Sequence, residues 1–334
     1  MKKIFVTGGA GYIGSHTVKQ LLEQDYEVTV FDNLSNSTMQ NLEVVQEMTG
    51  KTVEFIKGDL LNYDDIAEAI REDHEAVIHF AALKSVVDSQ SDPLSYYENN
   101  VGGSMNLFKA MLAKGVKKIV FSSSAAIYGQ PETLPITEDM PMQAVSVYGE
   151  TKAMMERIIK DMKVMGLDSV CLRYFNVAGA DKSGRIGEDP GALGNLIPRI
   201  FTNLIGKHDL IIYGNEFPTE DGTQVRDYIH VVDLASAHVK ALSYLEKNSG
   251  NVAINLGTGK GTTVLQLVNE VAKVTGKKVN FSYGPARAGE NIEIYAKCDL
   301  AKELLDWQAE HDYHQIIEDS WNWYKTCPEF QSIA

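Results

Sequence analysis

The chain has 334 residues, of which 44% are hydrophobic and 23% are charged. This length and composition are typical of a globular protein with a large core, and they favour two lobes. The 45 acidic residues outnumber the 31 basic ones, which gives a net charge of −14. That excess argues against nucleic acids and anionic membrane surfaces as partners.

The cysteines and histidines indicate neither a disulfide framework nor a metal site. Cys171, Cys298 and Cys327 are odd in number and far apart, which predicts free thiols in a reducing compartment. His311 and His314 lie close together, but a solvated pair fits them better than a metal site, so we expect no metal. The first apolar run is too short for a signal peptide, and no run approaches the ~20 residues of a membrane span. We therefore expect a cytoplasmic location.

Short β-rich runs alternate with amphipathic stretches through the first half of the chain. Strands are expected at residues 2–7, 27–31, 53–56, 76–80, 118–121 and 169–173. Helices are expected at residues 14–24, 66–71, 93–112 and 148–165. This alternation predicts an α/β fold with a Rossmann-type doubly wound parallel sheet and helices on both faces.

The pattern loosens after about residue 177, where glycine and proline become frequent. Further helices are expected at residues 196–205, 232–247 and 263–275. We predict a larger domain over residues 1–176 and a smaller, interleaved α/β lobe that binds the substrate over residues 177–334.

The segment VTGGAGYIGSH follows the first predicted strand and begins the first predicted helix. Gly9, Gly11 and Gly14 fit G-x-G-x-x-G, while Gly8, Gly11 and Gly14 fit G-x-x-G-x-x-G. Glycine allows the tight turn and lets the backbone approach a pyrophosphate, which the helix N-terminus attracts. Asp32 ends the next strand, where a carboxylate binds an adenosine ribose and repels a 2′-phosphate, so we expect NAD rather than NADP. A glycine turn beside a surface aspartate is the alternative.

A second acidic residue, Asp59, lies in the segment GDL at the end of the third predicted strand. An adenine base would lie at this edge of the sheet, and its amino group could donate to the Asp59 carboxylate. The alternative is an exposed aspartate in a turn.

Three residues indicate a proton-transfer site. Tyr148 and Lys152 are four residues apart and therefore share a helix face, and Ser124 ends the fifth predicted strand. Lowering the pKa of a tyrosine from ~10 to about 7 takes ~4 kcal/mol. A cation ~4 Å away at an effective dielectric constant of ~20 supplies about that much, and Lys152 with a cationic nicotinamide ring nearby could provide it. The alternative is a surface Tyr/Lys pair, which is common by chance.

Five segments together resemble one protein family. They are TGGAGYIG, SSSAAIYG, YGETK, RYFNVAGA and EDGTQVRDYIHVVDLASAH. They are similar to the extended short-chain dehydrogenase/reductase superfamily and, within it, to the UDP-glucose (UDP-galactose) 4-epimerase family. The resemblance extends from residue 2 to about residue 323, and DGTQVRDYIHV is its most specific part.

The resemblance implies an isomerase that reversibly epimerises UDP-galactose and UDP-glucose in galactose metabolism, through a 4-keto intermediate and with tightly bound NAD. Tyr148 would take the proton of the sugar 4-hydroxyl, Lys152 would lower the pKa of Tyr148 and bind the nicotinamide ribose, and Ser124 would hold the 4-oxygen. These three residues are thus expected to contact the cofactor, and Ser124 and Tyr148 the substrate as well.

The same resemblance implies the remaining ligand contacts. The other cofactor-binding residues would be Gly8, Gly11, Tyr12, Ile13, Gly14, Asp32, Asn33, Leu34, Ser35, Asn36, Ser37, Asp59, Leu60, Phe80, Ala81, Ala82, Lys84, Asn99 and Phe175. The UDP-hexose would contact Asn176, Asn195, Leu196, Ile211, Ile212, Tyr213, Arg226, Arg287 and Ile294. The arginines suit a dianionic UDP group in an acidic protein, although Arg226 could instead form an ion pair with its neighbour Asp227.

The family commonly pairs two subunits through the helices at 93–112 and 148–165, so we expect a homodimer. Met155, Ile159 and Met162 form an apolar stripe on the second of these helices, and such a stripe fits either the core or an interface.

The sequence departs from the family pattern at three positions. Ala126 stands where threonine is frequent, and Glu290 and Lys297 stand where aspartates are usual. In the family register Ile294 gates the pocket beside the sugar C2 group. Isoleucine is intermediate in size between the cysteine and tyrosine found there, so weak activity on N-acetylated UDP-sugars is expected.

Two other functions compete with epimerisation. A sugar-nucleotide 4,6-dehydratase would need an acid and a base just after Ser124, where this chain has Ala125 and Ala126. A non-catalytic nucleotide-sensing protein would not need the intact set of Ser124, Tyr148 and Lys152.

Overall fold

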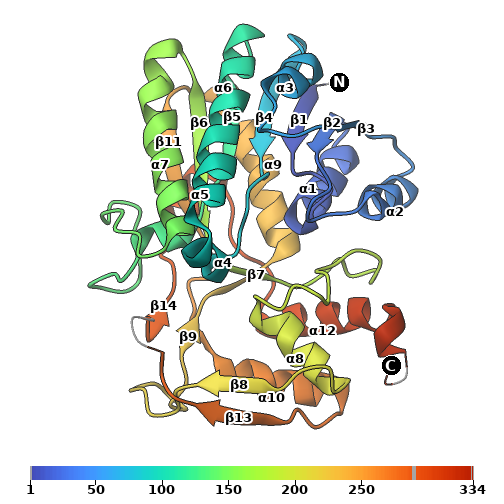
Figure 1. The fold of residues 1–334 in the computed structure, drawn as a ribbon, viewed down its shortest axis with the longest axis vertical. Helices are drawn as coiled ribbons and strands as arrows, with labels where there is room; N and C mark the ends of the chain where they lie inside the picture. The colour runs from blue at the N-terminus through green and yellow to red at the C-terminus, as the bar shows by residue number, and fades with distance from the viewer. Residues whose placement is uncertain (1, 288–290, 332, 334) are drawn as a thin grey trace.

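A seven-stranded parallel sheet forms the centre of the larger lobe (Figure 1). The computed structural model describes residues 2–287, 291–331 and 333. The strands are β1 (Lys3–Thr7), β2 (Glu27–Asp32), β3 (Glu54–Lys57), β4 (His74–His79), β5 (Lys118–Ser122), β6 (Asp168–Tyr174) and β11 (Asn251–Leu256). Their order is β11-β6-β5-β4-β1-β2-β3, and all neighbours are parallel. The strand order reverses between β1 and β4, so the predicted doubly wound fold is confirmed.

Helices cover both faces of this sheet, which is why its strands are almost continuously apolar. One face packs against α1 (Tyr12–Glu23), α2 (Met39–Thr49), α9 (Val231–Lys247) and α11 (Asp299–Leu305). The other face packs against α3 (Tyr63–Ala69), α6 (Ser104–Ala113) and α7 (Val147–Asp161). Phe5 of β1 points into the second core and Val6 into the first, as successive residues of a strand must.

The apolar stripe of α7 belongs to the core. Met155 and Ile159 are each 1% exposed, and Met162 just after the helix is 9% exposed. All three pack against the sheet with α3 and α6. Of the two readings of this stripe, the structure therefore supports the core, and the homodimer stays a prediction.

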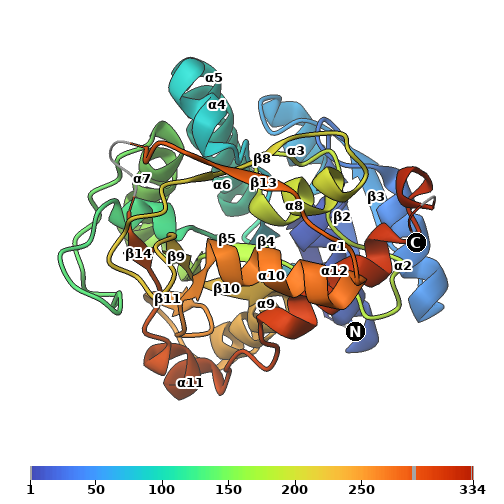
Figure 2. The ribbon, with the colours of Figure 1, turned by 90° about the horizontal axis from the view of Figure 1, so that it is seen from below.

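The smaller lobe has an apolar core of its own. Its elements are α8 (Leu196–Leu204), β8 (Leu210–Tyr213), α10 (Val264–Thr275), β13 (Phe281–Gly284) and α12 (Tyr313–Tyr324). In the view from below, α10 and α12 lie in front of the large sheet (Figure 2). No helix in the described part of the chain has both the length and the apolar character that a membrane crossing requires.

Short strands connect the two lobes. Strand β7 (Asn176–Ala178) pairs with β10 (Tyr228–His230), and β9 (Val225–Arg226) lies between β12 (Thr262–Thr263) and β14 (Glu293–Ile294). The larger lobe also contains segments beyond residue 176. There β11 forms one edge strand of the large sheet, and α9 packs against one of its faces. The division into domains at residue 176 stays a prediction.

One predicted helix is more complex than its sequence indicates. Residues 93–112 form α5 (Pro93–Tyr96), a wider π-helical segment (Tyr97–Gly103) and then α6. The helices α11 and α12 were not predicted, and neither were α2 and α4 (Val86–Ser91). Helices α2 and α4 each bury few residues, Leu42 and Val45 in α2 and Ser89 in α4, so their hydrophobic periodicity is weak.

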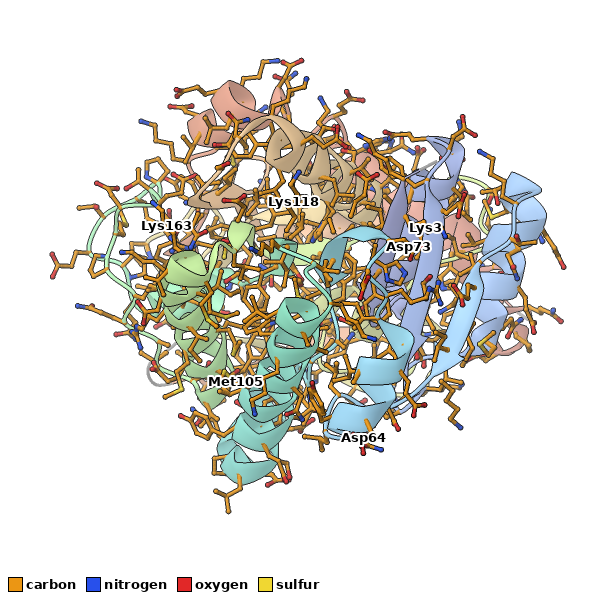
Figure 3. The ribbon with its side chains drawn as sticks, turned by 90° about the horizontal axis from the view of Figure 1, so that it is seen from above. Lys3, Asp64, Asp73, Met105, Lys118 and Lys163 are labelled. Atoms are coloured by element: carbon orange, nitrogen blue, oxygen red, sulfur yellow. The ribbon has the colours of Figure 1, made fainter. Side chains whose placement is uncertain are left out.

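The side of the large sheet where the strands begin and the side where they end carry different polar groups. Figure 3 looks onto the edge where the strands begin, with Lys3 at the start of β1 and Lys118 at the start of β5. Lys3 forms a partly exposed ion pair with Asp73, just before β4. Exposed pairs of this kind contribute only about 0–1 kcal/mol. The other edge, where the strands end, carries the polar groups described below.

A buried ion pair joins α7 to β6. Arg173 donates through Nε to both carboxylate oxygens of Glu156, at 3.0 and 3.1 Å, and through Nη2 at 2.6 Å. The Ser123 hydroxyl donates to the same carboxylate, and Arg173 Nη1 donates to the Tyr128 hydroxyl at 2.8 Å. Both charged side chains are less than one tenth exposed. Removing one partner would leave the other charge buried and uncompensated.

We expect Arg173→Met to lower the free energy of unfolding by about 3–5 kcal/mol, as is usual when one partner of a buried pair is removed. The matched control is Arg157→Met, which removes the partner of Glu150 in an exposed pair on the same helix and should cost less than about 1 kcal/mol. Urea unfolding followed by circular dichroism measures both. Equal losses in the two variants would contradict this account of the core.

Candidate active site

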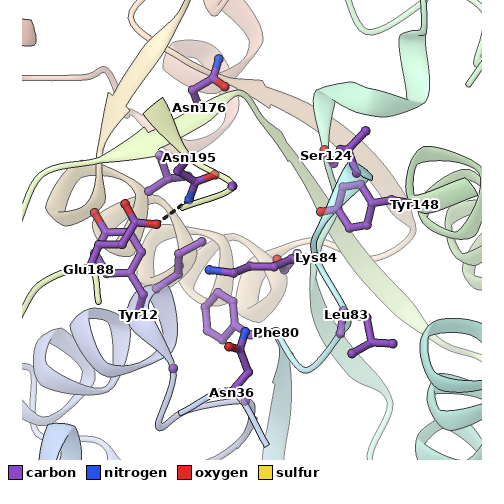
Figure 4. Close-up of a pocket in the computed structure, with 18 of the residues that line it drawn as sticks. Tyr12, Asn36, Phe80, Leu83, Lys84, Ser124, Tyr148, Asn176, Glu188 and Asn195 are labelled. Carbon is purple, nitrogen blue, oxygen red and sulfur yellow. Dashed lines mark hydrogen bonds between the residues drawn. The ribbon is translucent and has the colours of Figure 1, made fainter. Parts of the chain in front are cut away.

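A cavity of ≈ 620 Å³ lies between the carboxyl ends of the sheet strands and the smaller lobe. Parallel α/β sheets bind their ligands at this edge. Among the described residues, all of the predicted cofactor and substrate residues except Leu34 and Ile294 line the cavity, and Figure 4 shows several of them. The fold therefore brings together groups that are far apart in the sequence, while their individual roles stay predictions.

The glycine turn between β1 and α1 forms one wall of the cavity. Gly8 has a φ of +72°, which glycine adopts readily. A Cβ atom on Gly14 would lie 2.2 Å from the Gly8 carbonyl oxygen, so no larger residue fits. Gly11 precedes α1 and provides no capping side chain. The free amides of the first helical turn therefore face open space, and this arrangement fits the pyrophosphate of a dinucleotide.

Acidic residues follow at the ends of the next two strands. One Asp32 oxygen accepts from the Ala10 amide at 3.1 Å, and the other accepts from the Leu34 amide and the Ser37 hydroxyl, both at 2.9 Å. Asp59 accepts from Asn33 Nδ2 at 3.0 Å and lines the cavity. These contacts hold both carboxylates at the end of the cavity where a ribose and an adenine are expected.

Ser124 and Tyr148 lie side by side because the start of α7 packs closely against the segment after β5. Ser146 caps α7 by accepting from the Gly149 amide at 3.1 Å. A Cβ atom on Gly149 would lie 2.5 Å from the Ala126 carbonyl oxygen, so glycine lets the start of α7 approach the segment after β5. The Ser124 side chain lies beside the Tyr148 phenol here (Figure 4) and lowers the pKa of that phenol.

Lys152 lies one turn further along α7, and its side chain is 4% exposed. Its Nζ donates to the Ser122 carbonyl at 2.7 Å and lies 5.9 Å from the centre of the Tyr148 ring. Burial lowers the pKa of Lys152 to about 8, partly offset by the Glu156 carboxylate. At neutral pH most of Lys152 is therefore protonated, and it supplies positive charge to this part of the cavity.

The protein's own groups keep Tyr148 protonated at neutral pH. Burial raises the pKa of Tyr148 to about 12, and the neighbouring Ser124 side chain opposes that rise only in part. Reaching a pKa near 7 takes about 7 kcal/mol, at ~1.4 kcal/mol per unit. An ammonium ~6 Å away at an effective dielectric constant of ~20 supplies about 3 kcal/mol. The value expected from the sequence took no account of the burial of Tyr148. Lys152 alone therefore does not suffice, and the expected positive charge of the nicotinamide ring is needed as well.

The π-helical segment shapes the wall beside Tyr148. Asn99 lines the cavity. Asn100 holds the segment after β4, because its Oδ1 accepts from the Leu83 amide at 2.8 Å and its Nδ2 donates to the Leu83 carbonyl at 3.0 Å. The same Nδ2 lies 3.1 Å from the Thr151 hydroxyl oxygen in α7. These bonds fix the position of the cavity wall relative to α7.

The smaller lobe supplies the cationic end of the cavity. Arg287 lies over the Tyr213 ring, with its Cζ 3.7 Å from the ring centre. Hydrogen bonds from Arg287 and then Arg199 lower the pKa of Tyr213. Arg226 also lines the cavity, while its neighbour Asp227 is buried and accepts hydrogen bonds from residues 258, 259 and 296. Three guanidinium groups thus surround one end of the cavity, as an anionic ligand requires.

Comparison with known proteins agrees with this geometry. Residues 4–257 match the model of the NAD dependent epimerase/dehydratase family. The chain belongs to this family. NAD is therefore its cofactor, and the glycine turn with Asp32 is the part of the cavity that fits it.

Individual relatives cover nearly the whole chain. It is 50% identical over 325 residues to a UDP-glucose 4-epimerase of Bacillus subtilis, covering 96% of both chains. It is 44% identical to a bifunctional UDP-glucose 4-epimerase and UDP-xylose 4-epimerase of Pisum sativum, covering 98% of this chain and 97% of the relative. The structure of a UDP-glucose 4-epimerase from Bifidobacterium longum with NAD⁺ and UDP aligns with a TM-score of 0.93 at 39% identity, covering 98% and 99%.

Two charged residues of the cavity were missed by sequence reasoning. Arg199 lies four residues after Asn195, so helical spacing from a predicted site residue could have found it. Glu188 lies in a loop without a motif, and its burial depends on packing against α12, which no local pattern reveals. The cavity is also lined by Phe31, Gly58, Leu83, Val86, Val87, Ser122, Tyr174, Val177, Gly194, Ile197, Gln224, Tyr228 and Val264.

Some predicted features lie away from the cavity or outside the described residues. Ile294 pairs with Arg226 across β14 and β9 and packs against an apolar cluster that includes Ile127 and Ala296, so its proposed role as a gate stays a prediction. Glu290 lies outside the described residues. Lys297 forms an exposed ion pair with Asp299. Within the described residues, no group of three His, Cys, Asp or Glu side chains could hold a metal ion.

We expect Gly14→Ala to abolish retention of NAD, because the new methyl group would displace the Gly8 carbonyl from the phosphate turn. The control is Gly102→Ala, where the nearest atom to a new Cβ lies 4.0 Å away. The measurement is the amount of nicotinamide nucleotide released per chain on denaturation. Wild-type amounts of nucleotide in Gly14→Ala would contradict this assignment of the turn.

Proposed function

We propose that the protein reversibly converts UDP-galactose into UDP-glucose through a 4-keto sugar, using bound NAD, as a step of galactose metabolism. The observation that carries this proposal is the position of Ser124, Tyr148 and Lys152. They lie in one cavity with both the dinucleotide turn and the arginine-lined end of the smaller lobe. The names of the relatives support the same activity.

The chain's own residues have separable tasks in this reaction. The glycine turn and Asp32 would hold NAD⁺, which would supply the hydride acceptor and donor for C4 of the sugar and the positive charge of its nicotinamide ring. Tyr148 takes the proton from the sugar 4-hydroxyl and later returns it. Ser124 positions the 4-oxygen through its hydroxyl, and the Lys152 ammonium stabilises the tyrosinate. Arg226 and Arg287 hold the diphosphate and uridine end.

The same cavity argues against dehydration. Elimination of water from the sugar needs an acid and a base beside the 4-keto group. Ala125 and Ala126 follow Ser124, and neither side chain can transfer a proton. The segment after Ser124 therefore offers no acid or base for loss of water, and the site suits oxidation and reduction at C4 alone.

The activity itself is tested by a coupled assay that measures UDP-glucose formed from UDP-galactose without added nucleotide. We expect turnover by the protein as purified, because NAD remains bound. N-acetylated UDP-sugars in the same assay test the expected weak side activity. If the protein converts neither substrate class, the proposed function is wrong.

We expect Tyr148→Phe to reduce kcat by a factor of ~10² or more, the range for loss of a general acid–base group, while NAD stays bound. The control is Tyr63→Phe, which removes the hydroxyl of an exposed tyrosine in α3 and should leave kcat unchanged. Near wild-type turnover in Tyr148→Phe would show that another group moves the proton.

A further inference from the structure

Glu188 is a buried carboxyl group in the wall of the cavity. The residue is 4% exposed and lies in the loop between β7 and α8. Its carbonyl accepts from Trp323 Nε1 of α12 at 2.7 Å. Gly187 lies against the same indole, where a Cβ atom would be 2.4 Å from the Trp323 Cγ. The backbone around Glu188 is therefore held in place by the smaller lobe.

The Glu188 carboxyl group accepts a hydrogen bond from Asn195 Nδ2 (Figure 4). Asn195 is the residue before α8, where an asparagine usually caps the helix by accepting from an amide of its first turn. Its side chain makes no such bond here. Because the Asn195 side chain binds Glu188, it does not cap α8. The amides of the first turn of α8 are therefore left without a capping side chain. Leu196 and Ile197 of that turn line the cavity.

The protonation state of Glu188 determines which end of the Asn195 amide points into the cavity. A carboxylate can only accept, so it binds Nδ2 and leaves the carbonyl oxygen of Asn195 on the other side. A protonated carboxyl group can donate to that oxygen, which frees Nδ2 to donate to a ligand. A phosphate oxygen is repelled by the first arrangement and bound by the second.

The groups around Glu188 have opposing effects on its pKa. Burial raises the pKa of Glu188 to about 7, and the more exposed Asp189 adds to the rise. Lys84, from the segment after β4, and the hydrogen bond from Asn195 oppose it. Figure 4 shows the ammonium end of Lys84 turned toward Glu188. The phenols of Tyr12 and Tyr324 also face the carboxyl group and stay neutral, because burial raises both of their pKa values.

We propose that Glu188 is a positioning residue that sets the amide orientation of Asn195 and so couples binding of the UDP-sugar diphosphate to uptake of one proton. This inference rests on the proposed function, because it takes the diphosphate to lie beside Asn195. The two negative charges of the ligand also compete for Lys84, which further favours the neutral carboxyl group. The proton comes from solvent and resides on Glu188 while the substrate is bound.

The coupling predicts a pH dependence of a definite sign. Below pH 7 Glu188 is already neutral, and the substrate binds without proton uptake. Above pH 7 the binding-competent form becomes rare, so KM should rise by up to about tenfold per pH unit. Glu188→Gln keeps a donor for the Asn195 oxygen at every pH. Its KM should match the low-pH value of the wild type and stay constant.

The direct test is calorimetry of UDP-sugar binding to the NAD-loaded enzyme in buffers of different ionisation enthalpy. A pre-equilibrated mixture of UDP-galactose and UDP-glucose avoids heat from net turnover. We expect the wild type to take up about half a proton at pH 7 and nearly one at pH 8, as a group with a pKa near 7 must. Glu188→Gln should take up none. The control Asp189→Asn removes a charge one residue away and should still take up a proton, with the onset of uptake at a somewhat lower pH, because Asp189 raises the pKa of Glu188.

The outcomes separate this inference from the proposed function. If the wild type binds and epimerises the UDP-sugars without proton uptake, the inference is wrong and the proposed function stands. If Glu188→Gln takes up as many protons as the wild type, another group is responsible and the inference is again wrong. If the wild type shows neither binding nor turnover, the proposed function fails, and this inference fails with it.

Discussion

The close contact between the Gly8 carbonyl and Gly14 is the constraint on which the rest of the site depends. It lets α1 begin directly at the edge of the sheet, with its first amides directed into the cavity. The same turn also reaches the smaller lobe, because the Tyr12 hydroxyl donates to the Gly179 carbonyl at 2.7 Å. Further along α1, Gln20 donates to the Val232 carbonyl at the start of α9 at 2.9 Å. One tight turn thus fixes the cofactor wall and connects it to the substrate wall.

A second set of contacts explains why three consecutive serines end β5. The Ser122 carbonyl accepts from Lys152, while its hydroxyl is bonded to Tyr174. Ser123 donates to Glu156, and the Ser124 side chain lies beside Tyr148 (Figure 4). Tyr148, Lys152 and Glu156 are spaced by one helical turn each, so α7 presents them in a row along β5. The buried ion pair at the far end of this row holds α7 against the sheet, and Tyr148, the proposed proton-transfer group, occupies the end that faces the cavity.

The sequence was sufficient for the sheet, since the strand runs of a parallel sheet are apolar and both of its faces are buried. It was also sufficient for the placement of the glycine turn, Asp32, Ser124, Tyr148 and Lys152, because strands that end at one edge bring their last residues together. It could not reveal the π-helical segment before α6, since a wider helical turn has no pattern of its own. It could not reveal Glu188 either, because only the packing of a loop on Trp323 buries that carboxyl group. The energy needed to ionise Tyr148 was underestimated for the same reason, since burial is a property of the fold.

The central claim is that the cavity oxidises and reduces the same sugar carbon while NAD stays bound. The most direct test follows UDP-galactose that carries deuterium at C4 through complete equilibration in ordinary water. The account predicts that UDP-glucose keeps the full deuterium content at C4, because the hydride returns to the carbon that released it. Loss of deuterium to the solvent, or its transfer to added NAD, would contradict the account.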